Sequence, residues 1–201
     1  MSSHHIVRDE QEPALILLDL ADSMFDRVGE LLEWSPVVVA LPKAIPKLVE
    51  AQIKVDWAVF EPENEQKIRA YLEWQFPISY FPTSSSLLEF AFQELIAKNH
   101  KAVNVVLNQA DFGKRLPVLE KYAEKIDLVA YLPNSRVAFL NSNFGGYEKW
   151  LLAATKLELS REPLRTKNME SLTGNLWKVI ENGTISIEME GGSFWVKEIT
   201  E

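Results

Sequence analysis

Short apolar runs alternate with amphipathic stretches over the first three-quarters of the chain, and this alternation constrains the fold more than any other feature. Several runs, among them residues 37–41 and 103–107, are apolar almost throughout, which is typical of strands covered on both faces. Strands that alternate with helices predict an α/β fold with a mainly parallel, doubly wound sheet. The expected strands are residues 14–19, 37–41, 55–60, 78–81, 103–107, 127–131 and 137–140.

The stretches between these runs keep apolar residues at helical spacing. We expect a first helix with Ser23 as its N-cap, because Asp26 follows three residues later and apolar residues share one face beyond it. The serines before residue 87 offer N-caps in the same way. The further expected helices are residues 43–51, 63–74, 86–99 and 114–125.

The C-terminal part changes to a period of two residues. Residues 176–181, 184–190 and 193–199 alternate apolar with polar side chains, and Asn182-Gly183 and Gly191-Gly192 separate them. Both dipeptides indicate two-residue hairpin turns, because their residues tolerate positive φ. We therefore predict a β-meander in a small all-β domain, with a first domain over residues 1–155 and the second over 156–201.

Both faces of this meander carry large apolar groups. Strand alternation places Trp177 and Trp195 on one face, with Phe194 and Val196 on the other. Three short strands cannot bury two apolar faces alone, so one face needs a partner. The simplest partner is a second copy of the chain, which predicts a homodimer.

Composition excludes several classes of function. The 201 residues include no cysteine, so disulfides, thiol nucleophiles and cysteine-bound zinc are excluded, and three histidines give little material for a catalytic triad. The net charge of −8 disfavours nucleic-acid binding. No stretch reaches the ~18 apolar residues that a membrane span needs. We expect a cytoplasmic protein without nucleic-acid or membrane partners.

Carboxylates follow the expected strand at residues 55–60. Glu61 and Glu63 come directly after it and Asp56 lies at its start, and an open parallel sheet holds Mg²⁺ and phosphates just past its strands. A second interpretation is that Pro62 opens a helix whose positive N-terminus favours Glu63 and Glu65. The sequence alone leaves both interpretations open.

Short segments along nearly the whole chain resemble thiamine pyrophosphokinase, and they occur in that family's order. The segments are Ile53-Lys54-Val55-Asp56, Ser86-Leu87-Leu88-Glu89-Phe90-Ala91, Tyr147-Glu148-Lys149-Trp150, Thr166-Lys167-Asn168 and Asn182-Gly183-Thr184-Ile185-Ser186-Ile187. The resemblance implies an α/β domain for ATP and Mg²⁺ and a β domain that completes a thiamine pocket across a homodimer. It also implies transfer of diphosphate from ATP to thiamine.

Most of the family's site motifs are changed in this chain. Its Asn-Gly-Glu turn corresponds to Asp19-Leu20-Ala21, and its Asp-Gly-Ala to Pro42-Lys43-Ala44. Its Gly-Asp-x-Asp corresponds to Phe60-Glu61-Pro62-Glu63, which keeps the charge but loses the glycine. Its Asp-x-x-Thr-Asp lies over Ser84, Ser85, Ser86 and Leu87, where both aspartates are missing, and its Arg-x-Asp-His keeps only Arg115.

The resemblance assigns a candidate role to each surviving residue. The catalytic candidates are Glu61, Glu63 and Arg115, the nucleotide-binding candidates are Asp19, Ser84 and Ser86, and the Mg²⁺ candidates are Asp56, Glu61 and Glu63. For thiamine they are Asn175, in a possible remnant of a Gly-Ser-Asn motif, and Trp177 and Trp195, whose rings suit an electron-poor or cationic ring. A place in the core or at an interface is the alternative for both tryptophans.

Diphosphate transfer depends on metal ions, cationic clamps and backbone amides positioned on the phosphates. Gly29 is the sole glycine before Gly113, so no glycine-rich phosphate loop can be drawn in the expected nucleotide half. We therefore predict a thiamine-pyrophosphokinase-like protein with an eroded ATP and Mg²⁺ site, acting as a small-molecule-binding or structural homologue with weak or no kinase activity. The alternatives are an active thiamine pyrophosphokinase and a resemblance of fold alone.

Overall fold

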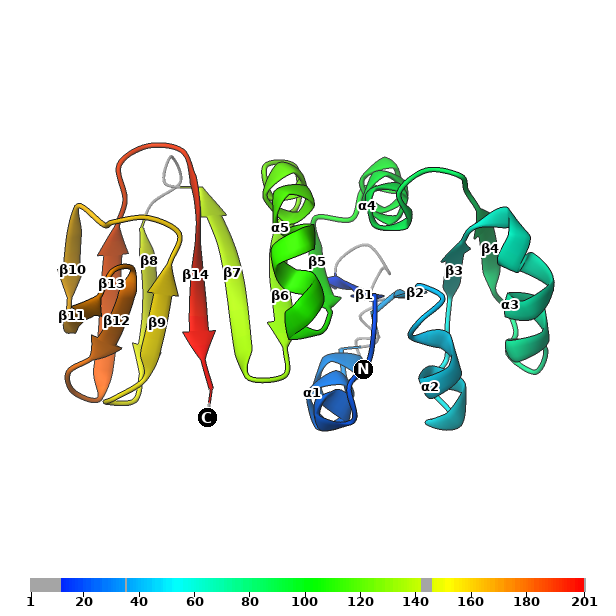
Figure 1. Ribbon diagram of the computed structural model, residues 1–201, viewed down its shortest axis with the longest axis horizontal. Helices are drawn as coiled ribbons and strands as arrows, with labels where there is room; N and C mark the ends of the chain where they lie inside the picture. Colours follow the sequence, from blue (N-terminus) through cyan, green and yellow to red (C-terminus); the bar gives the residue numbers. More distant parts are fainter. Residues whose placement is uncertain (1–11, 35, 142–145, 201) are drawn as a thin grey trace, which may run out of the picture. The chain divides into compact units, whose positions relative to one another are not determined.

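A computed structural model describes residues 12–34, 36–141 and 146–200 (Figure 1). The chain divides into two compact units, Met1–Lys114 and Arg115–Glu201. The expected division into a domain of residues 1–155 and a domain of residues 156–201 stays a prediction. Among the described residues, no helix is long and apolar enough to cross a membrane.

The first unit contains five parallel strands in the order β5-β1-β2-β3-β4. Every residue of β1, β2 and β3 is buried, as the apolar runs predicted. The register places Leu15 beside Val38 on one side and beside Asn104 on the other. The strands are β1 (Ala14–Leu17), β2 (Val38–Ala40), β3 (Trp57–Phe60), β4 (Ser79–Pro82) and β5 (Ala102–Val106).

Helices connect these strands, so the predicted alternation of strands and helices is confirmed. Two short 3-10 helices, η1 (Asp22–Met24) and η2 (Pro62–Asn64), precede α1 and α3. Ser23 was wrongly expected as an N-cap, because it lies inside η1, and Met24 precedes α1 without a side-chain cap. The helices are α1 (Phe25–Leu32), α2 (Ile45–Glu50), α3 (Glu65–Tyr71), α4 (Leu87–Ala97) and α5 (Gln109–Ala123), of which α5 runs across the boundary between the units.

The second unit is β-rich, which confirms the predicted fold class of an α/β part followed by β structure. One group of antiparallel strands has the order β6-β7-β14-β9-β12-β11, and a three-stranded sheet has the order β10-β13-β8. Side chains from both groups form one core, including Leu157 and Val196 from the first and Tyr147 and Ile187 from the second. The strands are β6 (Asp127–Leu132), β7 (Ser135–Asn141), β8 (Tyr147–Leu151), β9 (Lys156–Leu159), β10 (Arg165–Lys167), β11 (Met169–Thr173), β12 (Leu176–Val179), β13 (Gly183–Glu188) and β14 (Ser193–Ile199).

The predicted β-meander is wrong, although its strands and turns are present. β12 pairs with β9 and β11, β13 pairs with β8 and β10, and β14 pairs with β7 and β9. Gly192 has a φ of 91°, which favours glycine, so the chain turns where the sequence indicated, but the predicted two-residue hairpin does not form. The chain crosses between the two sheets at these turns instead of forming hairpins, because each strand finds its neighbours earlier in the sequence.

The predicted distribution of apolar groups over the two faces is also wrong. Trp177 and Glu198 both stand opposite Leu157, so Trp177 shares the face of Glu198, Val196 and Phe194. That face is covered by the three-stranded sheet of the same unit. Trp195 alternates to the other face of β14. This face therefore does not need a second copy of the chain to cover it, and the homodimer is expected from the family resemblance alone.

Candidate functional site

The carboxyl ends of the five parallel strands place several polar residues along one edge of the first unit's sheet, here called the carboxyl edge. Asp19 follows β1, Lys43 follows β2, Glu61 follows β3, Ser84 follows β4 and Asn108 follows β5. The strand order reverses at β1, with β2 to β4 on one side and β5 on the other. Open α/β sheets bind ligands outside the carboxyl ends of their strands near such a reversal, so this edge is the candidate site.

Asn108 connects the two strands at the reversal. Its Nδ2 donates to Asp19 Oδ2 at 2.7 Å and to Asp111 Oδ2 at 3.2 Å, and its Oδ1 accepts from the backbone N–H of Asp111 at 2.9 Å. The Lys43 Nζ lies 3.6 Å from Asp111 Oδ2. Asp19 also accepts from the backbone N–H of Leu20 at 2.8 Å. Two carboxylates, an amide and an ammonium group therefore meet beside β1.

Asn108 and Asp111 were not predicted as site residues from the sequence. A usable signal was present, because an asparagine directly after an apolar strand, with an acidic residue three positions later, is a helix N-terminus pattern. Asn108 does accept from the N–H three residues on at the start of α5. The amide group of the same side chain donates to Asp19. These two residues are 89 positions apart in the sequence, so only the fold brings them together.

Glu61 and Glu63 start a helix, which favours the second interpretation of the acidic segment. Glu61 is the N-cap of η2, Pro62 is its first residue, and Glu63 lies exposed in its first turn. The Glu61 Oε2 accepts from Asn64 Nδ2 at 3.1 Å. Both carboxylates lie at the carboxyl edge, but that of Glu61 already accepts a hydrogen bond from Asn64 in the same turn.

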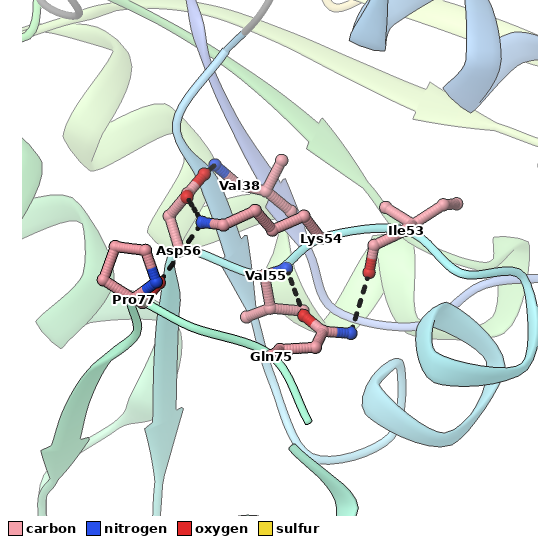
Figure 2. Close-up of polar contacts among 7 residues, drawn as sticks. All are labelled: Val38, Ile53, Lys54, Val55, Asp56, Gln75 and Pro77. Carbon is pink, nitrogen blue, oxygen red and sulfur yellow. Dashed lines mark hydrogen bonds and ion pairs between the residues drawn. The ribbon is translucent and has the colours of Figure 1, made fainter. Parts of the chain in front are cut away.

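Asp56 lies directly before β3, at the amino ends of the strands and therefore opposite the carboxyl edge. Its Oδ2 accepts from the backbone N–H of Val38 at 3.0 Å, and its Oδ1 forms an ion pair with Lys54 (Figure 2). Because β3 separates Asp56 from Glu61 and strands rise about 3.3 Å per residue, these residues cannot share one metal ion. Over residues 12–34, 36–141 and 146–200, no three His, Cys, Asp or Glu side chains are grouped to hold a metal. The expected ligand set for Mg²⁺ is therefore not assembled.

Figure 2 also shows that Gln75, in the segment between α3 and β4, forms hydrogen bonds with the backbone before β3. Gln75 Oε1 accepts from the Val55 N–H at 2.7 Å, and its Nε2 donates to the Ile53 carbonyl at 3.1 Å. Lys54 Nζ donates to the Pro77 carbonyl at 3.2 Å. Lys54, Asp56 and Gln75 thus form a structural network at the amino ends of the strands.

The hydroxyl-rich segment between β4 and α4 lies at the carboxyl edge. Ser86 is the N-cap of α4 but its side chain makes no cap hydrogen bond, and Ser84 is exposed. The Thr83 and Ser85 hydroxyls lie 2.8 Å apart. Arg115 is exposed within α5, at the first position of the second unit.

The three residues expected to bind thiamine do not form one surface. Asn175 is exposed in the turn between β11 and β12, and its carbonyl accepts from the Leu159 N–H at 2.9 Å. Trp177 packs against the core of the second unit. Trp195 lies on the other face, where its indole N–H donates to Glu120 Oε1 at 3.2 Å. The two indoles therefore cannot stack on one ring.

A buried ionic cluster in the second unit was not predicted. Glu198 accepts from Lys149 at 2.6 Å and from Arg136 at 2.9 Å, and the Tyr147 hydroxyl donates to the same carboxylate. Burial alone would raise the pKa of Glu198, but the hydrogen bonds from Lys149 and Tyr147 and the nearby cations outweigh burial and lower it. Burial and the bond to Glu198 raise the pKa of Tyr147. A glutamate on an otherwise apolar strand face was the available signal.

Comparison with models of known protein families gives no match, and comparison with curated proteins gives none either. Solved structures do match. The thiamine pyrophosphokinase of Bacillus subtilis is 11% identical with a TM-score of 0.69, covering 95% of this chain and 100% of that one. The enzyme of Geobacillus thermodenitrificans is 11% identical with a TM-score of 0.68, covering 94% and 97%. The yeast enzyme is 10% identical with a TM-score of 0.62, covering 97% and 88%. Over nearly its whole length, this chain has the fold of the thiamine pyrophosphokinases.

Proposed function

We propose that this protein is a thiamine-pyrophosphokinase-like homologue that binds a small polar molecule at its carboxyl edge and transfers diphosphate weakly or not at all. The observation that carries the proposal is the state of the carboxylates. Asp19 and Asp111 are bonded to Asn108, Glu61 is bonded to Asn64, and Asp56 lies at the opposite edge.

The arrangement of the carboxylates matters because diphosphate transfer depends on a metal ion that they would have to hold. Developing charge on the phosphates must be neutralised by metal ions and cationic groups, and Mg²⁺ needs near-octahedral oxygen ligands. Ser84 and Leu87 stand where the family resemblance leads one to expect aspartates, and neither side chain can supply a carboxylate. The donors present do not fit a dedicated Mg²⁺ site.

The edge retains hydroxyl, ammonium and carboxylate groups that could contact a polar small molecule. Ser84 and Ser86 offer hydroxyls at the start of α4, and the side chain of Lys43 is 70% exposed. ATP and thiamine, or related compounds, are the ligand candidates that the family resemblance implies. The homodimer and a cytoplasmic location belong to the same proposal.

A working thiamine pyrophosphokinase is the alternative. The fold likeness covers the full length of a thiamine pyrophosphokinase, and Glu61 and Glu63 keep two carboxylates at the edge. In that case these side chains would hold Mg²⁺ in an altered arrangement.

Turnover separates the two functions. The purified protein is incubated with ATP, thiamine and Mg²⁺, and AMP and thiamine diphosphate are quantified beside an intact thiamine pyrophosphokinase. We expect product at least about 10³-fold below the intact enzyme, since each lost ~1.4 kcal/mol of charge stabilisation is tenfold in rate. AMP release at an ordinary rate of about 1–10³ s⁻¹ would establish the alternative.

Calorimetric titration tests the binding part of the proposal. ATP and thiamine are titrated separately into wild type, Asp19→Asn and Lys43→Ala. Binding that the two substitutions weaken supports a ligand at the carboxyl edge. Absence of heat with either compound, together with absent turnover, would leave only the structural role.

A further inference from the structure

A pocket of about 490 Å³ lies in the second unit, where β8 ends, β9 begins and β14 ends. This volume is within the range of small-molecule sites. β8 belongs to the three-stranded sheet, whereas β9 and β14 belong to the other group of strands, so both groups contribute to the lining. Most of the lining is apolar, including Trp150, Leu152 and Ala153, and its charged members are Lys156 and Glu198.

The pocket is separate from the residues that were expected to bind thiamine. Asn175 contacts Leu159 at the far end of β9, whereas the pocket contains Lys156 at the start of that strand. Trp177 and Trp195 are not in the lining. Neither the carboxyl edge nor the expected thiamine contacts therefore account for this pocket.

Backbone hydrogen bonds fix the wall of the pocket between Leu152 and Thr155. The Ala154 N–H donates to the Val179 carbonyl at 2.9 Å, and the Val179 N–H donates to the Thr155 carbonyl at 2.9 Å. Trp150 and Leu152 are nevertheless each 58% exposed. The pocket is thus preformed and leaves apolar surface uncovered, which suits a ligand with an apolar body.

The buried ionic cluster supplies charge beside this apolar surface. Glu198 is 6% exposed and lines the pocket, and Lys149 and Arg136 both donate to its carboxylate. Burial and the bond to Glu198 raise the pKa of Tyr147, so its hydroxyl stays protonated at neutral pH. Two cations and one carboxylate leave the cluster with an excess of one positive charge, and Lys156 adds another in the lining.

A monoanion is the ligand that this distribution of charge favours. Lys149 directs hydrogens to both Glu198 oxygens, at 2.8 and 2.6 Å, and its side chain is 36% exposed. An ammonium group has three hydrogens, so one can reach a ligand. The excess of positive charge repels a cation, and the Glu198 carboxylate repels a multiply charged anion more strongly than a monoanion.

We propose that this pocket binds a small organic carboxylate with an apolar body, with Lys149 and Lys156 as its counter-charges and Trp150 and Leu152 as its apolar wall. A buried charged cluster beside a mainly apolar pocket is a combination that is typical of ligand sites. None of these residues belongs to the carboxyl edge, so the inference does not rest on the proposed function.

The test uses phenylacetate as the probe, with phenethyl alcohol and phenethylamine as its neutral and cationic counterparts. Binding of each compound to the full-length protein is measured by calorimetry at neutral pH. We expect saturable binding of phenylacetate, binding of the alcohol that is weaker by about threefold or more, and no binding of the amine.

Four substitutions locate the site. Lys156→Gln removes the exposed charge of the lining, and Lys167→Gln removes an exposed charge of the same unit outside the pocket. We expect the first to weaken phenylacetate about threefold or more and the second to leave it unchanged. Ala153→Phe places a ring in the pocket, so it should abolish binding of both the acid and the alcohol. Lys149→Gln keeps a donor for Glu198 but removes a charge, so it should also weaken the acid about threefold or more.

Thermal melts show whether each variant is folded, and Lys156→Gln and Ala153→Phe change exposed residues, so they test the pocket even if Lys149→Gln unfolds. Absence of phenylacetate binding at millimolar concentration would overturn the inference. Equal binding of the acid and the alcohol would overturn the preference for an anion. Binding that Ala153→Phe leaves unchanged, or that Lys167→Gln weakens as much as Lys156→Gln, would place the ligand outside the pocket. Asp19→Asn should leave phenylacetate binding unchanged, so the outcome for the carboxyl edge stays separate.

Discussion

Asp56 shows at the residue scale how a carboxylate beside a strand can serve the backbone. It accepts from the Val38 N–H at 3.0 Å and pairs with Lys54, whose Nζ also donates to the Pro77 carbonyl. These contacts connect the starts of β2 and β3 with the segment before β4. The residue was expected to bind Mg²⁺, and its contacts indicate a structural role.

Substitution of Asp56 tests that role. Asp56→Ala leaves the Val38 N–H without its acceptor, so we expect the free energy of unfolding to fall by about 1–2 kcal/mol. Asp56→Asn keeps an acceptor and loses only the partly exposed ion pair, so it should cost less, about 0.5–1 kcal/mol. Urea unfolding of the three proteins gives the order. Equal stability of wild type and Asp56→Ala would contradict the structural role.

Two tryptophans of the first unit differ sharply in exposure. Trp74 is 91% exposed, whereas Trp57 is 9% exposed and packs against Phe81 with ring centroids 5.4 Å apart. We expect Trp74→Ala to change the free energy of unfolding by no more than about 0.5 kcal/mol, and Trp57→Ala to lower it by about 3–5 kcal/mol. Urea midpoints of the two variants measure the difference. A large loss in Trp74→Ala would show that this ring is covered in solution.

At the element scale, Glu198 fastens β14 to its neighbour β7 and to β8 of the three-stranded sheet. Its carboxylate receives hydrogen bonds from Arg136 on β7 and from Tyr147 and Lys149 on β8. Glu198→Ala would leave these groups without their partner, so we expect a loss of about 2–4 kcal/mol in the free energy of unfolding. Glu158→Ala, at a pair with 42% exposure of the carboxylate, should cost under about 1 kcal/mol. Similar losses in both would show that Glu198 contributes no more than a surface pair.

The cluster also predicts a dependence of stability on pH. The folded-state pKa of Glu198 lies below the ordinary glutamate value of 4.5, so the folded state binds this proton less readily than the unfolded chain does. Its contribution is present above pH 4.5 and is lost as the pH falls through the lowered folded-state pKa. The stability difference between wild type and Glu198→Gln should therefore shrink on acidification, measured by urea unfolding from pH 7 to pH 3. A constant difference would contradict the lowered pKa.

At the scale of the whole molecule, the homodimer is now expected from the family resemblance and no longer from an uncovered apolar face. Trp177 was expected to bind thiamine, with a place in the core or at an interface as the alternative, and it packs on the inner face of the second unit. We expect light scattering to give twice the chain mass of 23.0 kDa at micromolar concentration. Trp177→Lys should lower the free energy of unfolding of the second unit, because it removes an indole that packs against the core, and it should not by itself yield a folded monomer. A wild-type monomer would refute the dimer, and a folded monomeric Trp177→Lys would return Trp177 to the interface.

The local pattern of the sequence was sufficient for the elements of the first unit. Strands that are apolar throughout and helices with one apolar face follow from spacing alone, because burial acts on each segment separately. The turn glycine at residue 192 was readable for the same reason. The family resemblance then pointed to the fold that the solved structures confirm.

Only the tertiary structure decided which residues meet. It paired β12, β13 and β14 with strands far away in sequence, separated Asp56 from Glu61 by the length of β3, and brought Asn108 to Asp19. These outcomes depend on strand order and register, and a slip of one residue moves a side chain to the other face. Sequence patterns determined the type of each element because that is a local property, whereas the sites depend on long-range pairing that local patterns do not contain.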